Sequence, residues 1–188
     1  VMTEGGNSGP DTDGKHICVR DADKAWIVIS AATSFFEGDD YDAAAREILK
    51  KATEGFDPDR LWEASVAAHK ELYDRVELHI ASEAVQTLPT DERLYAYAEG
   101  DEDNALAVLY YNYGRYLLIS STRPGSLPPN LQGLWANTYQ TPWNGDYHTN
   151  INVQMNHWIA EQANLSELHL PLTELVLNMI PSGEKTAK

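Results

Sequence analysis

The sequence predicts a mainly α-helical protein with a small N-terminal segment that contains β-strands. In the first third of the 188 residues, apolar and β-branched residues occur in short runs, which is typical of strands. After about residue 85, apolar residues recur at three- and four-residue spacing, which is typical of amphipathic helices. Long aromatic loops are expected between these helices. We therefore expect a boundary between the two regions near residue 85.

The N-terminal region combines loop, strand and helix patterns. Residues 1–24 are rich in Gly, Asp and Thr, and residues 1–16 predict a loop. Residues 25–36 (AWIVISAATSFF) are apolar and β-branched, and they predict a buried strand. A turn and a helix over residues 41–52 are expected to follow.

A clearer helix is predicted from Pro58 to about Asp74. Asp57 can cap this helix, and proline suits the first helical position because its missing N–H would be unpaired there anyway. Residues 76–80 (VELHI) then alternate between apolar and polar side chains, which predicts a short strand.

Four helices are predicted in the rest of the chain. The first begins at Thr90, a residue type that caps helices, and stops at Gly100. Prolines and a glycine predict a loop over residues 123–130. Pro181 is expected to kink the last helix. The helices after the first are expected over about residues 103–122, 151–162 and 171–180.

Composition and charge exclude several classes of partner. The net charge of −15 argues against nucleic acids and anionic membranes, because both require basic patches. Cys18 is the only cysteine, so no disulfide can form within the chain. No apolar run is long enough to span a bilayer, and the first residues lack the pattern of a signal peptide. Both ends are expected to be internal to a longer protein.

One stretch, NLQGLWANTYQTPWNGDYHTNINVQMNHW (residues 130–158), has an unusual composition. It contains three Trp and six Asn, and Asp146 is its only charged residue apart from histidines. Buried carboxamides are costly unless their hydrogen bonds are met, so a cluster of them predicts a partner that supplies those bonds.

Three polar residues in this stretch, His148, Asn150 and Asn152, alternate along the chain. An extended backbone would place their side chains on one face. Asparagine amides donate and accept hydrogen bonds, so a pair of them can orient a water or a sugar hydroxyl. The alternative is that these asparagines cap the following helix.

The aromatic residues of the stretch suit a sugar site. Pyranose rings have apolar faces that lie on aromatic rings, whereas their hydroxyls need polar partners such as amides. The alternative is that the indoles pack against the helical core. The aromatic candidates are Trp135, Trp143, Trp158, Tyr139 and Tyr147.

The sequence predicts neither a metal nor a cofactor. His148, His157 and His169 are separated by gaps that match no zinc-ligand pattern. The chain contains no phosphate loop and no nucleophile elbow. Three possible acid–base groups lie at helical, solvent-facing spacing: Glu161, Glu167 and Glu174.

Three consecutive blocks, YGRYLLISSTRPGSLPPNLQGLW, PWNGDYHTNINVQMNHWIAE and NLSELHLPL, closely resemble the signature blocks of glycoside hydrolase family 95. The motifs ISAATSFF, LYDRVEL and LPTDERL also resemble this family, so the similarity covers roughly residues 21–188. The family contains exo-acting α-L-fucosidases and some α-L-galactosidases.

The resemblance implies a mainly α fold with a partial (α/α)6 barrel, preceded by a small β-containing segment and a helical linker. Residues 1–56 would be the tail of a β-sandwich domain, residues 57–87 the linker, and residues 88–188 the first barrel helices. The remaining part of the parent chain would complete the barrel. A secreted or periplasmic location is implied by the family alone.

The resemblance also implies an inverting mechanism in which a Glu is the acid and an Asp is the base. Asn150 and Asn152 match the two asparagines that help the base to position water, and His148 matches a substrate contact. Further contacts with a fucosylated oligosaccharide are expected from three residues: Gln132, Trp135 and Trp143. The acid and the base are expected beyond Lys188.

This sequence departs from the family pattern at two positions, and several functions stay open. His157 stands where Tyr is common, and Gln154 stands where Glu is often found. Neither residue decides between L-fucose and L-galactose. A carbohydrate-binding or structural module without turnover is a further possibility, and so is a phosphorylase. A phosphorylase would need a basic phosphate pocket, whereas residues 130–158 contain no Lys or Arg.

Overall fold

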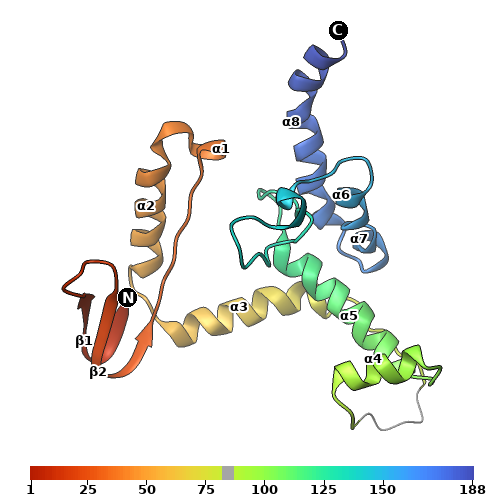
Figure 1. The fold of residues 1–188 in the computed structure, drawn as a ribbon, viewed down its shortest axis with the longest axis horizontal. Coiled ribbons are helices and arrows are strands. Elements are labelled where there is room, and N and C mark those ends of the chain that lie inside the picture. Colours follow the sequence, from red (N-terminus) through yellow and green to blue (C-terminus); the bar gives the residue numbers. More distant parts are fainter. Residues whose placement is uncertain (82–86) are drawn as a thin grey trace. The chain divides into compact units, whose positions relative to one another are not determined.

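The computed structural model describes residues 1–81 and 87–188, apart from the side chain of Phe36. The chain forms two compact units, Val1–Glu63 and Ala64–Lys188, which are described separately. Figure 1 shows the helices and strands. The described residues are mainly helical, with one small two-stranded sheet, and the predicted fold class is confirmed at this level. The boundary expected near residue 85 lies outside the described residues.

The first unit begins with a β-hairpin. Strand β1 (Met2–Pro10) pairs antiparallel with β2 (Ile17–Trp26), in a register that sets Met2 opposite Trp26. The loop predicted over residues 1–16 is therefore wrong for residues 2–10, whereas residues 11–16 form the turn between the strands. Backbone pairing across the hairpin stabilises strands whose Gly- and Asp-rich sequence has low strand propensity. The register of the two strands shifts between Glu4 and Gly5, where a β-bulge lies.

The predicted buried strand over residues 25–36 is also wrong. The chain is irregular after Trp26 and then enters the short helix α1 (Ser34–Glu37). Ile27 is 74% exposed and Ile29 is 85% exposed. No described strand pairs with this segment, so its β-branched sequence has no ladder to join. A 3-10 turn, η1 (Gly38–Asp40), leads into the expected helix α2 (Tyr41–Thr53).

The helix predicted from Pro58 is confirmed as α3 (Pro58–Tyr73), which runs from the first unit into the second. The Asp57 carboxylate caps it by accepting hydrogen bonds from the N–H groups of Asp59 and Arg60, at 3.1 and 3.0 Å. Residues 76–80 are irregular rather than a strand. Their alternating pattern lacks a neighbouring strand among the described residues.

Helices α4 (Thr90–Ala98) and α5 (Asn104–Ser121) are joined by a buried ion pair. Asp103 caps α5 by accepting from the Leu106 N–H at 2.9 Å. The same carboxylate binds the Arg93 guanidinium through two hydrogen bonds of 2.8 and 3.0 Å. Thr90 is the first residue of α4 rather than its cap, which is Pro89.

The last third of the chain contains short helices and one long helix. The helix predicted over residues 151–162 is divided into two by a turn at residues 156–158. The final helix is longer than predicted, and Pro181 lies inside it without ending it. These elements are η2 (Pro142–Gly145), α6 (Asn152–Met155), α7 (Ile159–Gln162), η3 (Ser166–His169) and α8 (Leu170–Thr186).

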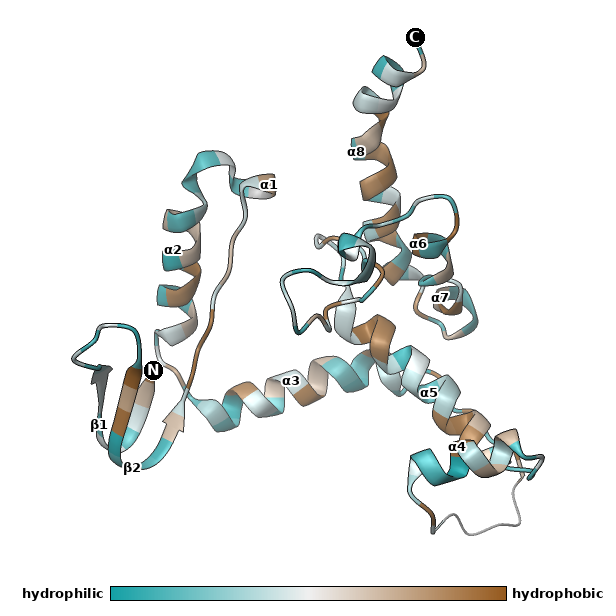
Figure 2. Ribbon diagram, viewed as in Figure 1, coloured by the Kyte–Doolittle hydropathy of each residue, from teal (hydrophilic) through white to brown (hydrophobic). Residues whose placement is uncertain are grey.

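The core of the second unit brings α3, α5, α7 and η3 together. Its buried apolar residues are Leu72, Leu118, Ile119, Ala160, Ala163, Leu165 and Leu168. Apolar residues also continue along α5 and α8, as the brown segments of Figure 2 show. Many of these are exposed on α8, including Val176 and Leu177. Within residues 1–81 and 87–188, no helix combines the length and the apolar character needed to cross a membrane.

Candidate active site

The segment between α5 and α7 is held together by side chains that bond to its own backbone. The Asn156 amide donates to the carbonyls of Pro129 and Asn130, at 3.3 and 3.0 Å. The Gln132 amide donates to the Pro142 carbonyl at 3.0 Å. The Asn130 carboxamide oxygen accepts from the Gln132 N–H at 2.9 Å. These bonds explain part of the high carboxamide content of residues 130–158, since an irregular loop must pair its backbone groups without a ladder.

The backbone is not extended between His148 and Asn152. His148 has a φ of 41°, and Asn152 is already the first residue of α6. Two bonds fold the segment into a turn: Val153 N–H donates to the His148 carbonyl at 3.4 Å, and the Gln154 amide donates to the Thr149 carbonyl at 2.6 Å. The alternating sequence therefore does not by itself place the three polar side chains on one face.

Asn150 and Asn152 differ from Asn130, Gln132 and Asn156 in their hydrogen bonding. Asn150 is exposed and Asn152 is half-buried. The cap of α6 is Ile151, and no side chain caps this helix, so the capping alternative does not apply. Within the described part of the chain, neither asparagine side chain has a protein hydrogen-bond partner. Both amides are thus available to a ligand or to a water.

Left-handed backbone conformations cluster near these asparagines. Trp143, Asn144 and His148 have φ values of 51°, 58° and 41°. Such conformations cost about 1–3 kcal/mol for non-glycine residues, and they collect at functional sites because the surrounding structure must enforce them. The imidazole Nε2 of His148 lies 3.7 Å from the carboxylate of Asp146. This distance is longer than a hydrogen bond, and the ring is half-buried.

A groove of about 830 Å³ separates α5 from the loop. Among the predicted site residues, Gln132 and Trp135 line it, whereas Trp143, His148, Asn150 and Asn152 do not. The structure therefore divides the candidates between two parts of one loop. The roles assigned to these six residues stay predictions.

Residues outside these six also line this groove, which we call the aromatic groove. They include Asn130 and Asn156 from the loop and Trp158 from the turn after α6. Trp158 carried a sequence signal because it belongs to the aromatic set of the loop. For Asn156, the sequence carried no signal beyond the composition of the loop. Its two carbonyl partners lie 26 and 27 residues away, so no local pattern indicates them.

His157 is fully buried next to the site. Its Nδ1–H donates to the Val153 carbonyl at 2.9 Å, and its ring stacks on His169 with centroids 5.6 Å apart. Burial lowers the pKa of His157, so the ring is neutral near pH 7. The His169 ring bonds in turn to Glu161 at 2.9 Å. Hydrogen bonds from Ser166 and His169 lower the pKa of Glu161.

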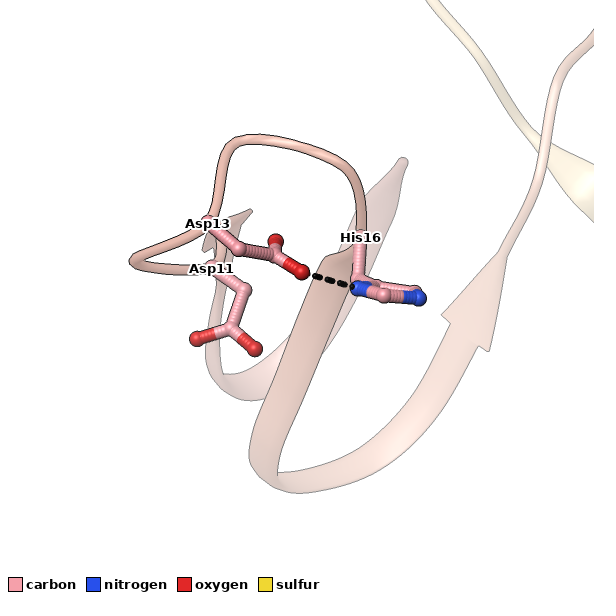
Figure 3. Close-up of side chains that lie close together, drawn as sticks. All are labelled: Asp11, Asp13 and His16. Carbon is pink, nitrogen blue, oxygen red and sulfur yellow. Dashed lines mark hydrogen bonds and ion pairs between the residues drawn. The ribbon is translucent and has the colours of Figure 1, made fainter.

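The candidate metal ligands lie elsewhere, in the loop between β1 and β2 (Figure 3). Within the described ranges, Asp11, Asp13 and His16 bring their ligand atoms within 4.8 Å of one another. Asp13 accepts from the Lys15 N–H and lies 2.8 Å from the His16 ring. These bonds, with Asp11 accepting from Thr12 N–H at 2.7 Å, account for the arrangement as a tight polar turn.

Comparisons with known proteins agree on one family. The model of the glycosyl hydrolase family 95 catalytic domain matches residues 57–188. "Probable alpha-fucosidase A" of Aspergillus niger is 52% identical over 101 residues, which cover 53% of this chain and 13% of that protein. The protein of the same name from Aspergillus oryzae is 49% identical over 89 residues, or 47% of this chain and 12% of its own length.

A plant relative aligns with the whole chain. "Alpha-L-fucosidase 2" of Arabidopsis thaliana is 34% identical over 201 aligned positions, which cover 100% of this chain and 24% of that protein. The chain therefore spans about a quarter or less of the length of these curated relatives.

Proposed function

This chain belongs to glycosyl hydrolase family 95, and from this premise we propose that it forms part of an exo-acting α-L-fucosidase. The reaction releases L-fucose, with inversion, from α1,2-fucosylated glycans. The observation that carries the proposal is the pair of unpartnered amides of Asn150 and Asn152, in a loop where Asn130, Gln132 and Asn156 bond to the backbone. The names of the relatives, which are fucosidases, support the same activity.

The role of Asn150 and Asn152 is to position the attacking water. An inverting glycosidase holds its two carboxyl groups about 6.5–9.5 Å apart so that a water fits beside the sugar. Carboxamides can orient this water without changing their own charge. The acid Glu and the base Asp belong to other parts of the parent protein, and no glutamate of this chain takes either role.

The substrate contacts come from the same loop. His148 donates or accepts a hydrogen bond at a sugar hydroxyl, and Gln132 provides an amide. Trp135 and Trp143, which are 49% and 72% exposed, offer apolar faces to the pyranose. A neutral sugar suits this loop, because Asp146 is its only charged side chain apart from histidines.

The larger architecture extends the same proposal. Residues 1–56 form the tail of a β-sandwich domain, residues 57–87 a linker, and residues 88–188 the first helices of an (α/α)6 barrel. The match to the catalytic-domain model begins at residue 57. Exposed apolar side chains such as Tyr110 and Leu177 pack against the rest of the barrel in the parent protein. The parent protein is secreted or periplasmic.

Residues 1–188 alone should release no L-fucose, because they lack both carboxyl groups and expose apolar helix faces. The test compares purified residues 1–188 with the full-length protein that contains them, on 2′-fucosylated lactose. Proton NMR of the first product anomer reads the stereochemistry. We expect β-L-fucose from the full-length protein only.

Other outcomes of this test point to other functions. Release of L-galactose from the matching galactoside at a higher kcat/KM would assign an α-L-galactosidase. Dependence of cleavage on added phosphate would assign a phosphorylase. Binding without any release would leave a carbohydrate-binding module. Turnover by the 188 residues alone would contradict the proposal that the acid and the base belong to other parts of the parent protein.

A further inference from the structure

Val153, the residue after Asn152, is held at both of its backbone polar groups. Its N–H donates to the His148 carbonyl at 3.4 Å, and its carbonyl accepts from the ring of His157 at 2.9 Å. Its side chain is buried, so it also packs in the interior. The backbone is thus fixed directly after Asn152, whose own carbonyl accepts from the Asn156 N–H at 3.2 Å.

The bond between His157 and Val153 has only one possible direction. A carbonyl oxygen can only accept, so the Nδ1 atom of His157 carries a proton and donates it. The Nε2 atom of the same ring is buried and has no hydrogen-bond partner within the described part of the chain. The ring therefore makes one hydrogen bond among these residues, and this bond goes to α6.

Two later elements fix the orientation of the His157 ring. Its face stacks on His169 of η3, with centroids 5.6 Å apart and ring planes inclined by 16°. The His169 ring bonds in turn to the Glu161 carboxylate of α7 at 2.9 Å. The second oxygen of that carboxylate accepts from the Ser166 hydroxyl at 2.6 Å. Because His157 is also fully buried, close packing leaves its ring little freedom to turn away from Val153.

The bond to Val153 depends on which side chain stands at position 157. Imidazole has a donor on the ring atom next to Cγ, which is close enough to the backbone to reach a carbonyl four residues earlier. Tyrosine, which is common at this position in the family, has its only side-chain donor at the far end of a longer ring. That hydroxyl lies too far from its own Cα to make the same bond. The bond is therefore a property of chains that carry histidine here.

An amide can orient a water only if its own position is fixed. The Asn152 side chain has no protein partner among the residues that the structure describes, so the backbone of α6 must set its position. We propose that His157 is a positioning residue, which holds α6 through the Val153 carbonyl so that the Asn152 amide meets the attacking water. His157 itself touches neither water nor sugar, because its ring is fully buried. This assignment rests on the proposed fucosidase function.

The test compares His157→Leu with His157→Asn in the full-length protein. Leucine and asparagine side chains have the same branched shape, but only asparagine can donate a hydrogen bond from near the position of Nδ1. We expect His157→Leu to lower kcat on a fucosylated trisaccharide about tenfold, because a displaced amide no longer aligns the water. KM should change less than about threefold, and His157→Asn should keep kcat within about threefold of the wild type.

Leu168→Val is the control for a loss of stability alone. Leu168 is fully buried in η3, and removing one methylene group there should lower Tm without removing a hydrogen bond to α6. Its kcat should remain at the wild-type value. Thermal melts of all three variants then separate the effect of stability from the effect of position.

The outcomes distinguish the role of His157 from the proposed function. A wild-type protein that releases no fucose overturns both. A wild-type fucosidase in which the Leu and Asn variants have equal kcat overturns the positioning role alone, whether that kcat is normal or reduced. The same holds if Leu168→Val loses as much kcat as His157→Leu, or if His157→Leu raises KM and leaves kcat unchanged.

Discussion

Two sets of carboxamides in one loop differ in what they bind. Asn130, Gln132 and Asn156 use their side chains to bond to the loop itself. Asn150 and Asn152 have no such partners within the described ranges. The same residue types thus fold the loop at some positions and remain available for chemistry at others.

This difference teaches that composition alone does not identify a site. A half-buried amide with a backbone partner contributes to stability, typically by about 1 kcal/mol. An amide that the fold leaves unpaired contributes little to stability. Substitutions can test this separation, because the two sets should affect different measurements.

The largest effect is expected at the unpaired set. In the full-length protein, Asn150→Ala and Asn152→Ala should each lower kcat by roughly 10²–10⁴-fold, because orienting the attacking water matters mainly in the transition state. Tm should change little, since no protein partner is lost among the described residues. Steady-state kinetics on a fucosylated trisaccharide, with thermal melts alongside, would check this. Near-normal kcat in both variants would remove the proposed distinction between the two sets.

The bonded set should show the opposite profile. Asn156→Ala leaves two loop carbonyls without their donor and should cost about 1–3 kcal/mol of unfolding free energy. Urea unfolding of the full-length protein would measure this loss. Asn137→Ala is the matched control, because Asn137 is exposed and lies in the same loop. Equal stability of the two variants would show that the loop does not depend on its amide bonds.

His148 should behave as a substrate contact, with a smaller effect. His148→Ala should raise KM roughly threefold to tenfold, the size expected for one hydrogen bond of about 1 kcal/mol. Its kcat should fall far less than in the asparagine variants. A dominant loss of kcat would place His148 with the water-positioning residues instead.

The smallest effect concerns pH and the buried His157. Burial lowers its pKa below the ordinary value of 6.5, so the unfolded chain binds a proton that the folded protein does not. Stability should therefore be complete above about pH 6.5 and should decline as the pH falls below that value. His169 and Glu161 are the titratable groups beside it. His157→Gln should flatten the dependence of Tm on pH between about 5 and 7, and an unchanged slope would contradict the assignment.

Local signals predicted those elements whose stabilising contacts are local. Helices α2 and α3 follow from periodicity and from the cap at Asp57, which bonds only to its neighbours. The strand predictions failed in both directions. Residues 2–10 pair despite weak strand propensity, whereas Ile27 and Ile29 remain irregular despite strong propensity. Strand formation depends on a partner strand, and sequence patterns do not show which partner is present.

By itself, the sequence determined the family, the mainly helical class and the loop in which the candidate site lies, because motifs and helical periodicity are encoded in neighbouring residues. Only the tertiary structure decided which carboxamides are free. Asn156 and Asn152 are alike in the sequence, but Asn156 meets carbonyls 26 and 27 residues away and Asn152 meets none in the described residues. A hydrogen bond requires atoms within about 3 Å. Only the path of the whole loop sets that distance.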